Sequence, residues 1–294
     1  MNRQVPFGGI WTDQKLQVLS GYLREYRKIF QKNLKASYYE ITYLDAFAGA
    51  GKIPRRERAL FEPLLPELEL ADEEFRKGSV RRALDVDPPF HHYVFIEKHV
   101  GKADELALIA EEFPSRKIEI IRSDANVALI EWCKKLDPRK ERAVVFMDPF
   151  GTCVEWSVIE TLARTKALDL WILFPCGAIN RMLPSNRKPR KSWSKRLTLV
   201  FGTDRWQEDF YTVNQYDSLL EEGKTVKEVR KTKNPKQITA FFVARMQKIF
   251  SAVAEPGYLY NSKGPLFALI FAAGNLKGAG PGKRIAEHLL RRLN

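Results

Sequence analysis

Residues 41–51 (ITYLDAFAGAG) form the stretch that decides the fold of this chain. The first four residues are an apolar run, which predicts a buried strand of a parallel sheet. The run ends at Asp45, and Gly49 and Gly51 follow with one residue between them. This spacing predicts a tight turn in which the backbone can approach a ligand that a Cβ would keep away. In open α/β sheets, a nucleoside cofactor binds at such a turn, beyond the carboxyl end of the first strand.

The residues around the turn exclude two common phosphate-binding motifs. A dinucleotide fingerprint requires a third glycine where Pro54 stands. A P-loop requires glycine in place of Ala46 and serine or threonine in place of Ile53. An acid, an aromatic and Gly-x-Gly resemble instead motif I of S-adenosylmethionine-dependent methyltransferases. That cofactor has no pyrophosphate, and its cationic amine suits a nearby carboxylate. An ordinary strand–turn–helix remains the alternative interpretation.

The rest of the chain alternates between strand and helix patterns. Strands are predicted over residues 93–97, 118–121, 143–147 and 168–174, and helices over 12–36, 100–113, 127–136 and 155–165. This alternation predicts a doubly wound, mostly parallel α/β sheet. Two late strands, 258–260 and 266–273, predict the terminal antiparallel pair that usually ends a Rossmann-like methyltransferase fold. We therefore expect a single domain over residues 1–294.

Two segments interrupt this pattern. Residues 52–90 are predicted to be an insertion after motif I, and residues 177–255 a basic, mainly helical insertion with helices near 204–212, 215–230 and 235–252. Near the end, Gly278, Gly280 and Gly282 predict a flexible turn before a last helix over 283–293.

Composition limits the partners and the compartment. The 294 residues carry a formal net charge of +13, which suits a polyanionic partner such as RNA or DNA. The longest apolar runs are far shorter than the roughly 20 residues of a membrane span, and no signal core follows the N-terminus, so we expect a cytoplasmic protein. The three cysteines, Cys133, Cys153 and Cys176, are isolated, so we expect free thiols and no metal.

An acidic residue stands at or just beyond the end of each of the first four strands: Asp45, Glu97, Asp124 and Asp148. Parallel strands end along one edge of the sheet, so these acids should line one crevice. In the methyltransferase pattern, Asp45 lies near the methionine end of the cofactor and Glu97 binds the ribose hydroxyls. Asp124 and the amide of Ala125 would face the adenine. A strand-end or helix-cap carboxylate is the alternative for any one of them. The predicted cofactor-binding residues are Asp45, Ala46, Phe47, Gly49, Gly51, Glu97, Lys98, Asp124 and Ala125.

The fourth of these acids opens the sequence Asp148-Pro149-Phe150-Gly151. It resembles the Asp-Pro-Pro-Tyr/Phe motif of methyltransferases that act on exocyclic amines of bases, and is more similar still to the Asp-Pro-Phe-Gly of tRNA guanine-N2 dimethyltransferases. Such an amine is a poor nucleophile because its lone pair is delocalised into the ring. The resemblance implies that Asp148 and the Pro149 carbonyl orient the amine and that Phe150 stacks on an extruded base.

A basic segment follows the fifth strand. Arg187, Lys188, Arg190 and Lys191 are predicted to bind a phosphate backbone while Trp193 stacks on a base. A solvated loop is the alternative. At the other end of the chain, we interpret Trp11 as the edge of the core and Lys15 as a solvated charge, in preference to positions over the cofactor pocket.

Taken together, these motifs resemble the three-Cys-motif partner family. The resemblance rests on Trp11, Thr12, Lys15 and Leu16 and on residues 43–49, 95–98, 124–126, 146–151 and 266–272. It implies a methyltransferase-like fold and a partner protein that carries a three-cysteine motif, which the cysteines of this chain are not. The leading hypothesis is in-line methyl transfer from S-adenosylmethionine to an exocyclic base amine of RNA or DNA. The alternative is a catalytically silent partner protein that binds nucleic acid or a cysteine-motif protein. A nicotinamide oxidoreductase is a more distant one.

Overall fold

The computed structural model describes residues 7–49, 78–149, 151–217, 225–261 and 264–293. Its centre is an eight-stranded sheet with the order β3-β2-β1-β4-β5-β10-β8, in which β9 also pairs with β10. The strands are β1 (Glu40–Asp45), β2 (His92–Ile96), β3 (Ile118–Ile121), β4 (Glu141–Met147), β5 (Leu168–Phe174), β8 (Ala252–Val253), β9 (Gly257–Asn261) and β10 (Gly264–Ala273). The first five are mutually parallel, and β10 runs antiparallel to β5. The predicted α/β fold and the antiparallel pair of late strands are confirmed.

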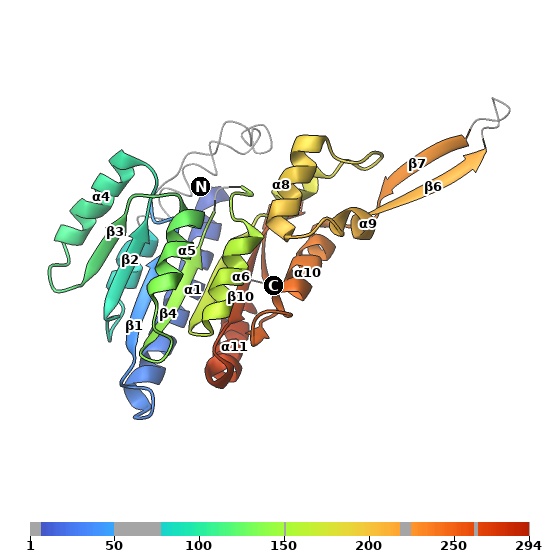
Figure 1. Cartoon of the computed structure of the whole chain (residues 1–294). Helices are drawn as coiled ribbons and strands as arrows, with labels where there is room; N and C mark the ends of the chain where they lie inside the picture. The colour runs from blue at the N-terminus through green and yellow to red at the C-terminus, as the bar shows by residue number, and fades with distance from the viewer. Residues whose placement is uncertain (1–6, 50–77, 150, 218–224, 262–263, 294) are drawn as a thin grey trace, which may run out of the picture.

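Helices cover both faces of the sheet (Figure 1). One face packs against α1 (Phe7–Lys32), α4 (Val100–Glu111) and α11 (Leu276–Leu290). The other packs against α5 (Ala125–Lys135), α6 (Trp156–Thr165), α7 (Cys176–Met182), α8 (Lys191–Phe201), α9 (Trp206–Phe210) and α10 (Pro235–Met246). Successive side chains of a strand point to opposite faces of the sheet, so each strand contributes to both hydrophobic layers. Tyr43 and Phe95 face the α1 side, whereas Leu44 and Ile96 face the α5 side.

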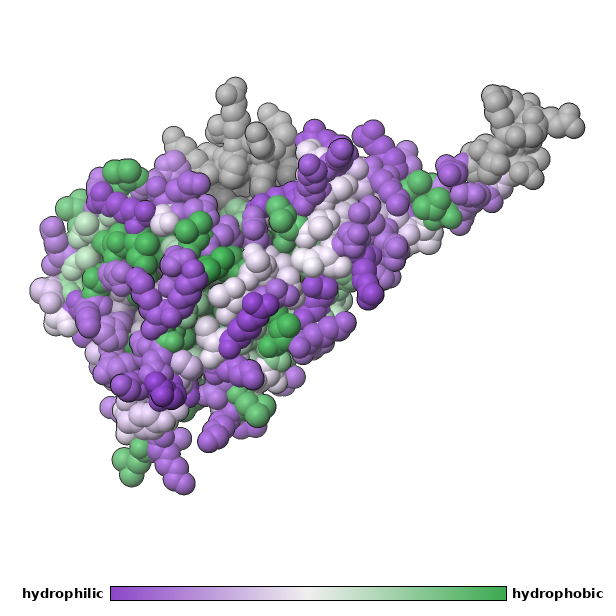
Figure 2. Space-filling model, viewed as in Figure 1, coloured by the Kyte–Doolittle hydropathy of each residue, from purple (hydrophilic) through white to green (hydrophobic). Residues whose placement is uncertain are grey.

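The segment after β5 differs from the prediction in one respect. The helix expected over residues 215–230 is wrong, because this region forms the antiparallel strands β6 (Tyr211–Asp217) and β7 (Thr225–Lys231). Together they form an arm that projects from the body (Figures 1 and 2). The lysines and glutamates of this segment suggested a helix, but its β-branched residues Thr212, Val213 and Val229 favour strands.

One further expectation changes near the core. The flexible turn predicted at Gly278, Gly280 and Gly282 is wrong, because α11 already begins at Leu276, where the Asn275 side chain accepts from the amide of Lys277.

The insertion predicted over residues 52–90 stays a prediction, because residues 52–77 lie outside the described residues. Residues 78–84 are helical and bury apolar side chains in the same core as α1.

Two further observations concern the cysteines and the length of the helices. The three cysteines are free, with Cys176 buried and the other two half-buried. Within the described ranges, no helix combines the length and apolar character needed to cross a membrane.

Candidate functional site

The parallel register brings the predicted acids to one edge of the sheet. Asp45 is the last residue of β1, level with Phe95 of β2 and Phe146 of β4. Glu97 directly follows β2 and Asp148 directly follows β4, while Asp124 lies three residues beyond β3. All four therefore lie at the carboxyl edge, which is the upper end of the strands in Figure 1.

Asp45 organises the turn that follows β1. Its carboxylate is 1% exposed and accepts from the Phe47 amide at 3.0 Å and from the Ser79 hydroxyl at 3.3 Å. The Ala46 amide donates to the Phe146 carbonyl at 2.9 Å, and the Ala48 amide to the Ile96 carbonyl at 3.1 Å. The turn is thus fastened to both neighbouring strands, with its backbone position fixed.

Glu97 and Gly49 lie against each other. A Cβ on Gly49 would overlap the Glu97 carboxylate, so a larger residue here would require the Glu97 side chain to move. Glu97 is 5% exposed, and its Oε1 accepts from the His99 amide at 2.6 Å. A buried carboxylate is therefore held directly beside the backbone of the turn.

Asp124 has a structural role that is visible in the fold. It caps α5 by accepting from the Asn126 amide at 3.0 Å, and the Lys98 ammonium lies 3.4 Å away. Partial burial raises the pKa of Asp124, but the hydrogen bonds from Asn126 and Lys98 outweigh burial and leave the pKa below its usual value. Ala125 is the first residue of α5 and is buried. The carboxylate is thus ionised near the adenine position that the motif implies.

Asp148 pairs with a residue that the sequence did not assign to the site. The Lys15 ammonium lies 3.0 Å from Asp148 Oδ2, and the two side chains are only 10% and 6% exposed. The expectation that Lys15 is a solvated charge is wrong. A signal was present, because Lys15, Leu19, Tyr22 and Tyr26 repeat at helical spacing on one buried face of α1.

Some predicted residues cannot be located. Phe150, Gly51 and the side chain of Trp11 lie outside the described residues. Pro149 is buried directly after Asp148, and Gly151 has a positive φ of 58°, which favours glycine.

The basic segment lies in and before α8. Arg187, Lys188, Arg190 and Lys191 are exposed, as a phosphate-binding role requires. Trp193 is half-buried against the core, and the Arg190 guanidinium carbon lies 4.1 Å from its ring centroid. A base would have to displace Arg190 to stack on that face.

Sequence reasoning did not assign to the site a second aromatic group, which lies near the carboxyl edge of the sheet on β9. Ala268 of β10 pairs with Phe174, the last residue of β5, so the strand β9 beside it also reaches the carboxyl edge. Strand β9 carries Tyr258 and Tyr260, and the latter is 40% exposed. The ammonium of Lys236, in α10, lies 5.1 Å from the Tyr258 ring centroid and 5.5 Å from the Tyr260 ring centroid.

The strand order and the antiparallel β10 define the class: this is a methyltransferase-like α/β fold. No family model matches the chain, and none of the curated proteins is similar to it. The solved protein LPL1258 from Legionella pneumophila is similar over 96% of this chain and 92% of its own, with a TM-score of 0.50 and 13% identity. At that identity the likeness shows the fold alone.

Two other solved structures are less similar. The N-terminal domain of EvdMO1 with SAH bound has a TM-score of 0.37 and 11% identity, over 87% of this chain and 80% of its own. A putative methyltransferase, yhhF from Escherichia coli, has a TM-score of 0.27 and 13% identity, over 72% and 85%. Scores this low carry no argument for this protein.

Proposed function

We propose that this protein is an S-adenosylmethionine-dependent methyltransferase that acts on an exocyclic base amine of RNA or DNA. The observation that carries the proposal is the contact between Gly49 and the buried Glu97 at the carboxyl edge. A glycine turn packed directly against an acid that follows the second strand suits a nucleoside whose ribose hydroxyls donate to that acid.

The residues at the turn fit the cofactor. Glu97 would accept from the ribose hydroxyls, and the cationic methionine amine would lie near Asp45. The remaining contacts would come from the other predicted residues: Ala46, Phe47, Gly49, Gly51, Lys98, Asp124 and Ala125. When bound, S-adenosylmethionine supplies an electrophilic methyl group.

Asp148 is the proposed acceptor for the target amine. A carboxylate accepts hydrogen bonds from an amine, and Asp148 Oδ2 already accepts from the Lys15 ammonium at 3.0 Å. Together with the Pro149 carbonyl, Asp148 would hold the amine so that the nitrogen lone pair points at the methyl group. After transfer, the methylated amine would lose one proton to water. Phe150 is the proposed stacking residue.

Nucleic acid is the proposed partner. The net charge of +13 and the exposed Arg187, Lys188, Arg190 and Lys191 support it electrostatically. Tyr260, with Lys236 beside it, adds an exposed aromatic ring on which a base can stack.

The test is calorimetric titration with S-adenosylmethionine and S-adenosylhomocysteine, followed by transfer of tritiated methyl to RNA and DNA pools. We expect saturable binding that is lost in Asp45→Ala and kept in Asp209→Asn, an exposed acid on α9. Binding of neither ligand to the wild type would overturn the proposal.

A second candidate is a catalytically silent member of the three-Cys-motif partner family, which binds nucleic acid or a cysteine-motif protein. The Lys15 ammonium favours it, because that cation already occupies an oxygen of the acid that a target amine requires. Cofactor binding without methyl transfer to any nucleic-acid pool would support this reading over the first.

A further inference from the structure

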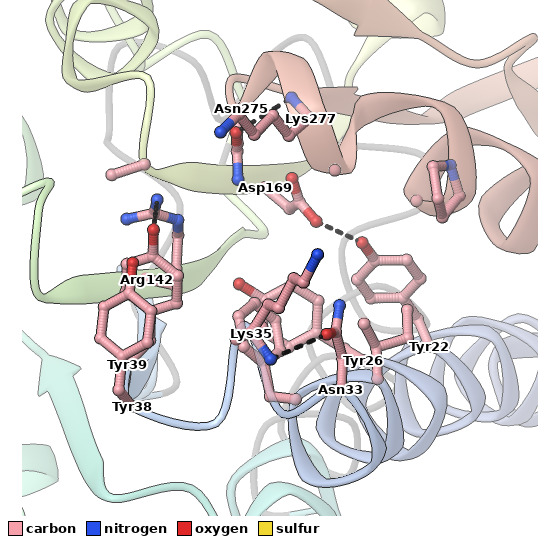
Figure 3. Close-up of a pocket in the computed structure, with 17 residues that line it drawn as sticks. Tyr22, Tyr26, Asn33, Lys35, Tyr38, Tyr39, Arg142, Asp169, Asn275 and Lys277 are labelled. Atoms are coloured by element: carbon pink, nitrogen blue, oxygen red, sulfur yellow. Dashed lines mark hydrogen bonds between the residues drawn. The ribbon is translucent and has the colours of Figure 1, made fainter.

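The opposite edge of the sheet contains a cavity that the proposed function does not use. It has a volume of ≈ 380 Å³ and lies between α1, residues 33–39, the first residues of β4 and β5, and the start of α11 (Figure 3). Arg142 and Asp169 are near the amino ends of β4 and β5, whereas Asp45 ends β1 and Glu97 directly follows β2, so these two acids do not line the cavity. A cavity of this size is within the range of small-ligand sites.

Aromatic rings form the walls. One face of α1 contributes Tyr22, Tyr26 and Phe30. The ring centroids of Tyr22 and Tyr26 are 5.9 Å apart, and those of Tyr26 and Phe30 are 4.9 Å apart. Tyr38 and Tyr39 come from the segment before β1. Rings fixed by one another and by the core present flat apolar surface to a planar ligand.

A buried carboxyl group forms the floor. Asp169 is 8% exposed, and its Oδ2 accepts from the Tyr22 hydroxyl at 2.5 Å. Its other oxygen has no hydrogen-bond donor among the described residues, and none of their lysines or arginines lies within ion-pair distance of it. Burial raises the pKa of Asp169 to about 7, although the Tyr22 hydrogen bond and the nearby Arg142 act in the opposite direction. A ligand N–H would satisfy the open oxygen.

The mouth of the cavity is cationic. Lys35 and Lys277 both line it and are exposed, and within the described ranges neither has a carboxylate partner. Arg142 lies behind them with its guanidinium 3.7 Å from the Tyr39 ring centroid. The first turn of α11 adds the positive end of a 15-residue helix. An anionic group is therefore favoured at the mouth.

We propose that this cavity binds a purine nucleoside 5′-monophosphate. A base N–H donates to Asp169, the two fused rings pack between the aromatic walls, and the phosphate lies at the mouth beside Lys35 and Lys277. A nucleotide carries its donor edge and its anion at opposite ends, which matches a buried carboxyl and an exposed cationic rim. A free amino acid does not match, because its ammonium and carboxylate share one carbon. A polyamine is repelled by the three cations.

The test is calorimetric titration of the full chain with guanosine 5′-monophosphate while S-adenosylhomocysteine is present in excess. We expect saturable binding that weakens about tenfold or more in Asp169→Asn, because an asparagine whose oxygen accepts from Tyr22 turns its NH2 group, a donor, toward the donating edge of the base. Lys277→Ala, an exposed change that leaves the core intact, should weaken it about threefold. Inorganic phosphate alone should compete weakly.

The matched control is Asp209→Asn, the same chemical change at an exposed position on α9, which should leave nucleotide binding unchanged. Absence of saturable binding to the wild type would overturn the proposal. So would wild-type affinity in both Asp169→Asn and Lys277→Ala, or a loss of binding in Asp209→Asn as large as in Asp169→Asn. The proposal does not depend on methyl transfer, so either idea can fail without the other.

Discussion

The Asp169→Asn variant should become more stable than the wild type as the pH rises, because the wild type loses stability and the variant does not. In the folded protein, burial raises the pKa of this carboxyl to about 7, whereas its ordinary value is 3.8. Between these two values the unfolded chain has lost the proton and the folded chain has kept it. Stability therefore falls as the pH rises through this window, and above pH 7 the full penalty remains. Asparagine has no proton to lose, and its oxygen can still accept from Tyr22.

The magnitude follows from the two pKa values. At about 1.4 kcal/mol for each unit of pKa, a rise from 3.8 to about 7 corresponds to a penalty of about 4 kcal/mol at neutral pH. The difference in unfolding free energy between Asp169→Asn and the wild type should thus grow by about 4 kcal/mol, in favour of the variant, between pH 4 and pH 8.

Urea unfolding at half-unit steps of pH, followed by circular dichroism, measures this difference. Asp209→Asn is the control, because it makes the same chemical change at an exposed position on α9 and should give a difference that is flat with pH. A flat difference for Asp169→Asn would refute the reasoning. A difference that shifts toward the wild type as the pH rises would show that Arg142 holds Asp169 ionised.

Three other predictions concern the carboxyl edge and one thiol. Gly49→Ala should weaken S-adenosylhomocysteine binding at least about tenfold in calorimetry, because the new methyl group overlaps Glu97; unchanged affinity would separate Glu97 from the cofactor. Lys15→Met should lower the unfolding free energy by about 3–5 kcal/mol, since Asp148 stays buried without its cation. Most of that loss should be recovered when Asp148→Asn is added, and a double-mutant cycle without coupling would contradict this. Burial raises the pKa of Cys133 to about 12, so maleimide should label it slowly at pH 8 until urea unfolds the chain.

The sheet could be predicted because its parallel strands are short and mainly apolar, and β1, β2, β4 and β5 are largely buried. Residues 168–174 and 118–121 form β5 and β3 with the predicted bounds. Once five strands alternate with helices, the parallel arrangement and the common edge follow, and with them the positions of Asp45, Glu97 and Asp148. This part of the site depends only on local pattern and sheet geometry.

Contacts between distant segments could not be predicted in the same way. Lys15 and Asp148 are 133 positions apart, and Tyr22 and Asp169 are 147 apart. Nothing local distinguishes a lysine that pairs inside the protein from one that is solvated, apart from its phase on the helix. The β6–β7 arm was missed because its lysines and glutamates suit a helix, whereas the antiparallel pairing of the two segments stabilises strands. In α11, Gly282 serves close packing: a Cβ there would lie 3.3 Å from the Tyr22 hydroxyl.

Helix α1 connects the two edges of the sheet, and its polar residues treat two buried acids differently. Lys15 brings a cation to Asp148, 3.0 Å from its Oδ2, at the carboxyl edge. Tyr22, two helical turns further on, donates a hydrogen bond to Asp169 but brings no charge. Asp169 lines the cavity, so a donor from a ligand there can reach its second oxygen. Burying a polar group costs free energy unless it is hydrogen-bonded. Lys15 and Tyr22 are both buried on α1, and each has its acid as a partner, one at each proposed ligand site.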